Sequence, residues 1–244
     1  MMRRTFATAL RVLRQLLHDK RTIALIFVVP CILLGLLAWI YQATPRLFDF
    51  VGVTLLGVFP FVIMFLTTSI TTLRERASGT LERLLALPIG KLDILQGYAI
   101  TFGGLAVVQS IIVSLLAVHV YGLNVAGPEW FLVLVALVDA LLGTALGLLV
   151  SAFAQSEFQA VQFMPAFILP QFLLCGLLVP LSQMPHVLEV VAKMLPLTYA
   201  VEALQSVGQH ASVQTLAYRD VGIVLGFVVV AIILGAITLR RQTD

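Results

Sequence analysis

The most chemically varied stretch of this chain is residues 74–91, a charged segment between two long apolar runs. Residues 78–80 (Ser-Gly-Thr) are typical of a helix N-cap, and Glu82 places a negative charge in the first turn. Pro88 is expected to end this helix. Its apolar side chains fall on one face: Leu81, Leu84 and Leu85. The pattern predicts a short amphipathic surface helix, suited to docking on a partner protein.

No motif indicates catalysis by this chain. A phosphate-binding loop of the G-x-x-x-x-G-K-[ST] type is absent, because Leu92 follows Gly90-Lys91 and Leu85 stands where the first glycine would be. The sequence contains no H-E-x-x-H or G-x-S-x-G motif, its four histidines are scattered, and Cys31 and Cys175 lie apart in apolar runs. We therefore expect no enzyme activity, metal site or bound cofactor, and energy for any transport must come from another chain or an ion.

One acidic residue, Asp139, lies inside an apolar run. Trp130 is typical of a membrane interface, and nine residues at ~1.5 Å each put Asp139 near the bilayer centre. Such a residue suggests an ion or substrate path. The alternative is a structural carboxyl that is protonated or hydrogen-bonded to a neighbouring polar side chain, and the sequence leaves both open. The polar neighbours considered are Gln109, Ser110, Gln162 and Gln171.

Composition places the chain in a membrane. Of its 244 residues, 60% are hydrophobic and only 11% are charged, whereas soluble domains carry about 25% charged residues. Six apolar segments have the ~17–25 residues that a membrane-spanning helix needs. They are residues 22–41, 51–73, 96–118, 130–153, 161–181 and 221–239. The fifth is expected to kink or break, since it contains three prolines, Pro165, Pro170 and Pro180.

The distribution of basic residues predicts orientation. If the N-terminus is cytosolic, the outer loops hold only Arg46, Lys193 and Arg219 of the 15 Lys and Arg residues. Both termini are therefore expected in the cytosol. Residues 1–21 form an amphipathic helix with Phe6 and Leu17 on its apolar face and Arg11 opposite. This helix either lies in the headgroup layer on anionic lipid or acts only as a positive anchor.

Residues 182–220 are expected outside, but they are too apolar for a watery loop. A ten-residue piece between Pro185 and Pro196 is too short to cross the bilayer. It predicts a re-entrant or interfacial helix pair whose corners are set by the two prolines. In the fourth apolar segment, Gly143 and Gly147 form a G-x-x-x-G stripe, for which we favour packing within the chain over packing between two copies.

Taken in order, these features resemble the membrane subunit of type-2 ABC exporters, a group that includes daunorubicin-resistance and glycan permeases. One motif is Arg74-Glu75-Arg76-x-x-Gly79-Thr80-Leu81-Glu82 with Pro88, between the second and third spans. The other is Pro180-x-x-x-Met184-Pro185, followed after ten residues by Pro196-Leu197-Thr198-Tyr199. The resemblance covers nearly the whole chain.

The resemblance implies a separate ATP-binding subunit, which uses ATP and Mg²⁺, with two copies of it and two permease copies in the working exporter. It implies that residues 74–91 are the coupling helix, with these contacts: Arg74, Glu75, Arg76, Gly79, Thr80, Leu81, Glu82, Leu84, Leu85 and Pro88. A second, smaller ATPase contact would involve Ser156 and Glu157. An extracellular gate would be formed by Pro180, Met184, Pro185, Pro196 and Tyr199.

The predicted protein is an all-α integral membrane permease with six spans, forming one domain over residues 1–244 of a bacterial plasma membrane. It would export an amphipathic or hydrophobic compound, such as a drug, lipid or glycolipid, and would contact lipid but no nucleic acid. The polar side chains considered for the substrate path are Asp139, Gln109, Gln162 and Gln171. Two alternatives are an ion- or proton-coupled carrier using Asp139 and a membrane anchor that recruits a soluble protein.

Overall fold

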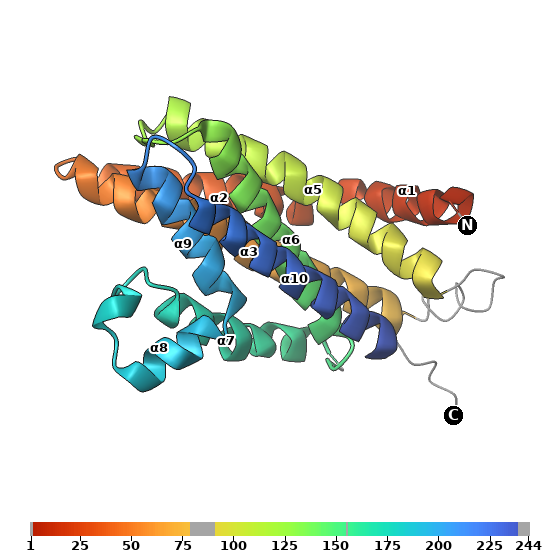
Figure 1. The fold of residues 1–244 in the computed structure, drawn as a ribbon. Coiled ribbons are helices and arrows are strands. Elements are labelled where there is room, and N and C mark those ends of the chain that lie inside the picture. Colours follow the sequence, from red (N-terminus) through yellow and green to blue (C-terminus); the bar gives the residue numbers. More distant parts are fainter. Residues whose placement is uncertain (1, 79–90, 155, 239–244) are drawn as a thin grey trace.

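The structure, a computed structural model, describes residues 2–78, 91–154 and 156–238. These residues form helices and no strands (Figure 1). The long helices are α1 (Met2–His18), α2 (Lys20–Ile40), α3 (Pro45–Ala77), α5 (Lys91–His119), α6 (Glu129–Ser151), α7 (Glu157–Leu174) and α10 (Thr215–Thr238). Between α7 and α10 lie the short 3₁₀ helix η1 (Leu181–Gln183), α8 (His186–Lys193) and α9 (Pro196–Gln209).

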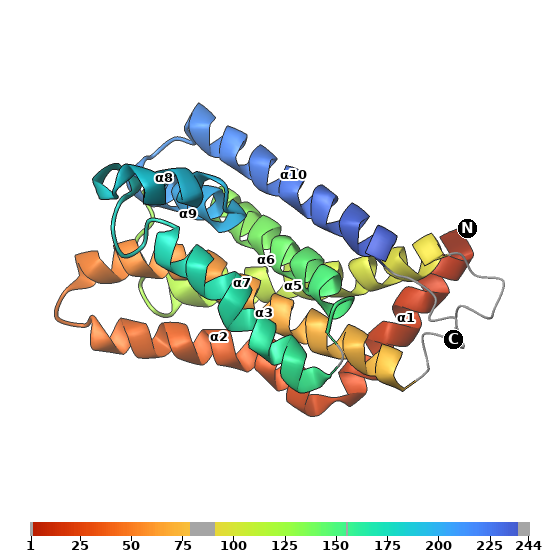
Figure 2. The same cartoon turned by 90° about the horizontal axis from the view of Figure 1, so that it is seen from below.

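The long helices other than α1 run side by side between two ends of the molecule (Figures 1 and 2). One end holds α1, the end of α3, the start of α5 and the end of α10. The other end holds the α2–α3 turn, α8 and the start of α10. Following the orientation predicted from the basic residues, we call the first the inner end and the second the outer end.

The closest packing in the bundle joins α3 to α6, and it depends on the two glycines of the G-x-x-x-G stripe. A Cβ at Gly147 would lie 2.6 Å from the carbonyl oxygen of Phe65, and one at Gly143 would overlap the carbonyl of Phe61. Only glycine permits the two backbones to approach this closely. The prediction that this stripe packs within the chain is confirmed.

Five of the described helices, α2, α3, α5, α6 and α10, are long and apolar enough to cross a membrane. The predicted fifth span, residues 161–181, corresponds to helix α7, which ends earlier, at Leu174. The apolar part of α7, Phe158–Leu174, is shorter than the five helices named above. The segment breaks as expected, but the break follows Leu174, since Pro165 and Pro170 both lie inside α7. The chain instead turns at Gly176, whose φ of +94° favours glycine.

Helix α9 is a core element rather than a surface one. Its residues Leu197, Val201 and Leu204 are fully buried, and the helix packs against α3, α6 and α10. The predicted corners at the flanking prolines are confirmed, since Pro185 is the N-cap of α8 and Pro196 begins α9. Residues 182–220 therefore contain one partly exposed helix, α8, and one buried helix, α9.

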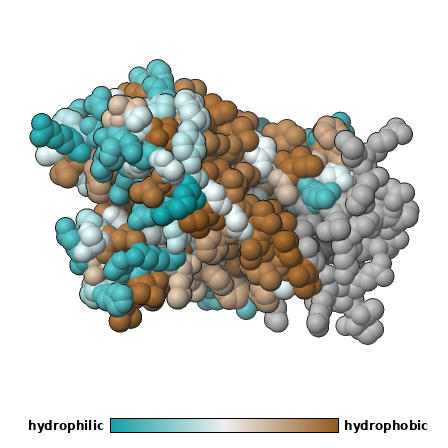
Figure 3. Space-filling view, in the orientation of Figure 1, coloured by the Kyte–Doolittle hydropathy of each residue, from teal (hydrophilic) through white to brown (hydrophobic). Residues whose placement is uncertain are grey.

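The face of the bundle seen in Figure 3 is apolar across its middle, and hydrophilic side chains gather toward the outer end. Large apolar side chains are exposed along α2, α7 and α10, among them Trp39, Phe167 and Val229. Such a continuous apolar belt is stable in lipid but not in water. The described residues thus have the architecture of an all-α multi-pass membrane protein.

Candidate functional site

The predicted coupling segment begins inside a membrane helix. Helix α3 continues past residue 73, the predicted end of the span, to Ala77, so Arg74, Glu75 and Arg76 form its last turn. Ser78 is the C-cap of this helix. Seven of the ten predicted coupling contacts lie outside the described residues: Gly79, Thr80, Leu81, Glu82, Leu84, Leu85 and Pro88.

Glu75 is directed into the protein, with only 2% of it exposed. Its Oε2 accepts a hydrogen bond from Nη2 of Arg11 at 2.8 Å and another from the hydroxyl of Tyr98. Arg11 belongs to α1 and Tyr98 to α5, so one carboxylate joins three helices. Hydrogen bonds to an ionised group are stronger than those between neutral groups.

The two arginines beside Glu75 extend this connection to further helices. Nη1 of Arg76 donates a hydrogen bond to the backbone carbonyl of Ser151, the last residue of α6. Nη1 of Arg74 lies 3.7 Å from Oδ2 of Asp19, the N-cap of α2. We call Arg74, Glu75 and Arg76 the inner hub, because they link the end of α3 to α1, α2, α5 and α6.

The partners of the inner hub were not predicted from the sequence. Arg11 was assigned to the lipid-facing polar side of α1, whereas its guanidinium contacts Glu75. The buried face of α1 contains Ala9, Val12 and Leu16, while Phe6 and Leu17 of the predicted apolar face are exposed. The hydroxyl of Thr101 donates to the carbonyl of Ala9 at 2.8 Å, so α1 is held on α5 by direct contacts.

The second predicted ATPase contact lies at the start of α7. Ser156 is exposed and is the N-cap of this helix, where its hydroxyl accepts a hydrogen bond from the amide of Gln159 at 3.2 Å. Glu157 is the first residue of α7. Both residues follow the inner end of α6, which contacts the inner hub through Ser151.

Asp139 is fully buried in α6, and neither carboxyl oxygen has a hydrogen-bond partner among the described residues. It lies against α3 and α9. A Cβ added at Gly57 would be 2.9 Å from its Oδ2 and 2.6 Å from Cδ1 of Leu204. Burying an unpaired negative charge in such surroundings costs several kcal/mol of free energy, so the neutral form of this side chain is favoured.

Of the two forms expected for a structural Asp139, the hydrogen-bonded one is not found, because none of its four expected polar neighbours bonds to it among the described residues. Gln109 donates to the carbonyl of Ile26 at 2.8 Å, and Gln171 donates to the carbonyl of Phe167 at 2.9 Å. Gln162 is exposed on α7, and the hydroxyl of Ser110 is buried without a partner among the described residues. The four residues predicted for a substrate path, Asp139, Gln109, Gln162 and Gln171, thus share no hydrogen bond among the described residues.

The outer proline motif has a clear structural role at the α8–α9 corner. Thr198 donates to the carbonyl of Ala192 at 2.7 Å, and Tyr199 donates to the carbonyl of Lys193 at 2.7 Å. These bonds satisfy carbonyls at the end of α8 that have no partner within the helix. Of the other residues predicted for the gate, Pro180 and Met184 flank η1 and Pro185 and Pro196 begin α8 and α9.

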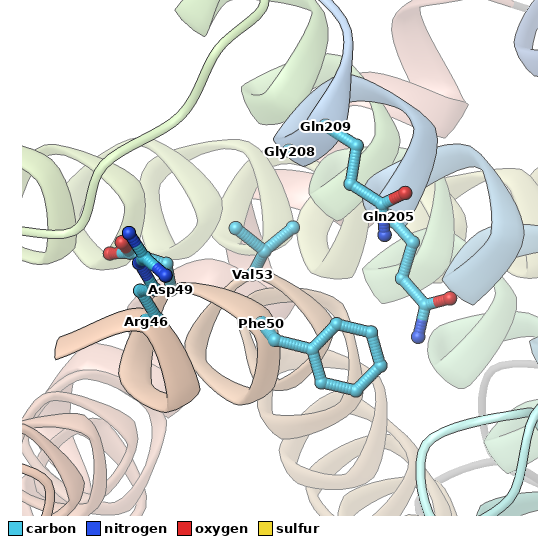
Figure 4. A pocket seen from close by; sticks show the side chains of 7 residues that line it. All are labelled: Arg46, Asp49, Phe50, Val53, Gln205, Gly208 and Gln209. Carbon is cyan, nitrogen blue, oxygen red and sulfur yellow. The ribbon is translucent and has the colours of Figure 1, made fainter. Parts of the chain in front are cut away.

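A small pocket of about 210 Å³ opens between α3 and α9 at the outer end (Figure 4). Its walls carry Arg46 and Phe50 from α3 and the amides of Gln205 and Gln209 from α9. Gln205 donates to Oγ1 of Thr54 at 3.3 Å, and Asp49 accepts from the amide of Asn124 at 2.9 Å. Two of its polar side chains are thus engaged in contacts within the protein, and the pocket lies where α3 meets α9.

Comparison with known proteins agrees with this architecture. The model of the ABC-2 type transporter family matches residues 3–207. The chain is 25% identical over 202 residues to "ABC transporter G family member 20" of Dictyostelium discoideum, a match that covers 81% of this chain and 27% of the relative. It is 27% identical over 184 residues to "Probable multidrug ABC transporter permease YbhS" of Escherichia coli K12, covering 75% and 49%.

A third relative is "Linearmycin resistance permease protein LnrN" of Bacillus subtilis, which is 26% identical over 170 residues, covering 70% of this chain and 44% of the relative. The chain thus spans half or less of the length of these curated relatives. The family match extends from α1 through α9 and includes the inner hub, Asp139 and the α8–α9 corner. The chain therefore belongs to the ABC-2 type transporter family.

Proposed function

We propose that this chain is the membrane subunit of an ATP-driven exporter and that residues 79–90 receive the motion of a separate ATP-binding subunit. The chain supplies the passage through the membrane, and the partner binds ATP and Mg²⁺ and hydrolyses ATP. Two copies of each subunit make the working complex, in a bacterial plasma membrane with both termini in the cytosol.

The observation that carries the proposal is the inner hub. Residues 79–90 follow it almost directly, and its side chains contact α1, α2, α5 and α6 as well as continuing from α3. A displacement of residues 79–90 would therefore reach α1, α2, α5 and α6 through hydrogen bonds and an ion pair, as well as α3 through the backbone. Closely packed helices transmit such a displacement because they are nearly incompressible.

The exported compound is expected to be amphipathic or hydrophobic. The names of two relatives refer to multidrug transport and linearmycin resistance, and 60% of the residues of the present chain are hydrophobic. The second permease copy and the lipid would cover the apolar side chains exposed on α2, α7 and α10.

Co-purification with an ATP-binding protein, sought first among the products of the neighbouring genes, tests the proposal. Leu84→Asp combined with Glu82→Arg should abolish binding and substrate-stimulated ATP hydrolysis, because it removes part of the apolar face and reverses a charge. Each leucine buried in a partner cleft contributes about 1.5–3 kcal/mol. Normal co-purification of this double variant would contradict the proposal.

A matched control makes the same types of change at the opposite end. Leu216 is exposed at the start of α10 and Glu129 is exposed at the start of α6. Leu216→Asp combined with Glu129→Arg should insert, fold and bind the ATP-binding protein as the unmodified chain does.

A further inference from the structure

A second and larger pocket lies at the outer end between α8 and α9. It has a volume of about 410 Å³, within the range of small-molecule sites. Pro180 and Leu181 form an apolar wall, and Glu189, Lys193, Glu202 and Gln205 provide polar groups. We call this cavity the α8–α9 pocket. It is distinct from the α3–α9 pocket of Figure 4, although Gln205 lines both.

The charged groups of the α8–α9 pocket are not evenly paired. Lys193 forms an ion pair with Glu189, with Nζ 2.5 Å from Oε1, so this cation is already engaged. Glu202 is half-buried on α9 and has no hydrogen bond or ion pair among the described residues. A partly desolvated carboxyl in this position gains most from an incoming cationic hydrogen-bond donor.

The surroundings of Glu202 favour its neutral form on balance. Burial and the negative charge of Asp220 raise the pKa of Glu202 above its usual range, and Arg219 and Lys193 oppose the shift only in part. Arg219 is itself bonded to Asp220, with Nη2 2.8 Å from Oδ1. The nearest cations are thus each held by another carboxylate, and neither provides Glu202 with a partner.

Exposed apolar side chains lie beside the α8–α9 pocket. Along α8, Val187, Leu188 and Met194 are exposed, while Lys193 and Glu189 line the pocket. An amphipathic helix of this kind lies in the membrane interface with its apolar side chains in lipid. A ligand at this pocket can therefore keep an apolar body beside α8 or against Pro180 and Leu181 while its polar head reaches Glu202.

We propose that the α8–α9 pocket binds the ammonium group of an amphipathic amine, with Glu202 as the carboxylate that recognises it. This rests on the proposed function in placing the pocket at the exit side of an exporter, but the binding itself requires no ATPase. The amine belongs either to a free amphiphile or to the headgroup of an aminolipid, since both present the same ammonium chemistry to the pocket.

Binding to the purified permease, without ATP-binding protein, tests the assignment. Three probes share one hydrocarbon cage and differ in charge: 1-aminoadamantane is a cation, 1-adamantanol is neutral and 1-adamantanecarboxylate is an anion. In phosphatidylcholine nanodiscs, the cation should bind about tenfold more tightly than the alcohol, the ratio that corresponds to about 1.4 kcal/mol. The anion should bind least.

Glu202→Gln should remove the preference for the cation, whereas Glu129→Gln, at an exposed outer position outside the pocket, should keep it. Cation binding should also weaken as the pH falls, because protonation neutralises Glu202; Asp220, Arg219, Lys193 and Glu189 are the charged groups around it. Equal binding of cation and alcohol to the unmodified chain, or a preference that survives Glu202→Gln, would overturn the proposal.

Replacing phosphatidylcholine by phosphatidylethanolamine identifies the source of the amine. A weaker apparent affinity for 1-aminoadamantane would assign the pocket to an aminolipid, and an unchanged affinity would assign it to a free amphiphile. The result is independent of the ATPase test. A permease that fails to bind its ATP-binding protein but shows Glu202-dependent amine binding would retain this pocket and lose only the exporter function.

Discussion

At the end of α3, the carboxylate of Glu75 accepts hydrogen bonds from Arg11 and Tyr98, which belong to two different helices. Its charge is buried, but each donor compensates part of the cost of removing it from water. The sequence motif around Glu75 identified an important segment, and the structure shows that this residue connects helices within the chain. Its effect on a partner would be indirect, through the position of α3.

Glu75→Ala should lower the free energy of unfolding by about 1–3 kcal/mol, because it leaves the Arg11 guanidinium and the Tyr98 hydroxyl without their acceptor. Thermal unfolding in detergent measures this, with Glu129→Ala as the control at an exposed carboxylate. Replacing both charged partners, by Glu75→Leu with Arg11→Met, should recover much of the loss. Equal melting of the Glu75→Ala and Glu129→Ala proteins would show that the inner hub contributes nothing.

Asp139 leads to a different expectation. Because the side chain is buried without a partner, Asp139→Asn should preserve assembly, transport and the pH dependence of transport. Transport assays in vesicles between pH 6 and pH 8 provide the measurement. Exposed carboxylates stay ionised throughout this range, because their usual pKa is about 4–4.5. A variant that assembles normally but loses transport would instead support the ion-coupled alternative.

At the scale of elements, hydropathy located the long helices but not their ends. Residues 74–77 resemble a loop because three of the four are charged, yet these three side chains have partners on other helices and α3 continues to Ala77. The burial of α9 was also missed. Leu197, Val201 and Leu204 recur at helical spacing, which is a usable signal of a buried face, but the prediction of a re-entrant or interfacial helix pair did not use it.

Contacts between distant segments could not be read from one sequence. The pairing of Glu75 with Arg11 and Tyr98, and the isolation of Asp139 from Gln109 and Gln171, depend on which helix faces align. Residue type and helical period place a side chain on a face, but they do not fix the neighbour that this face meets. The glycine stripe was the exception, because only a close helix contact requires two glycines four residues apart.

Gly143→Ala should destabilise the protein by about 1–3 kcal/mol, because the new methyl group overlaps the backbone carbonyl of Phe61 and forces α3 from α6. Gly226→Ala in α10 is the matched control, since nothing lies within 4 Å of the position its Cβ would take. That control should be neutral or slightly stabilising, as alanine favours helix over glycine. Thermal unfolding of the two variants compares them, and equal destabilisation would contradict the close α3–α6 contact.

For the whole molecule, the inner and outer ends were assigned from basic residues, of which only Arg46, Lys193 and Arg219 fall on the outer side. Reporter fusions after Gly90 and Gln242 should therefore read cytosolic, and fusions after Gly127 and Gln209 should read external. The positive-inside bias supplies the reason. An external reading after Gly90 would place residues 79–90 out of reach of any ATP-binding protein.

The central claim is that residues 79–90 contact an ATP-binding subunit, and site-specific photocrosslinking measures this directly. p-Benzoylphenylalanine introduced in place of Leu84 should crosslink to the ATP-binding protein in intact membranes. The same group in place of Leu216, exposed at the outer end, should give no such product. Crosslinking from position 84 to lipid alone, in membranes where the ATP-binding protein is present and active, would contradict the account.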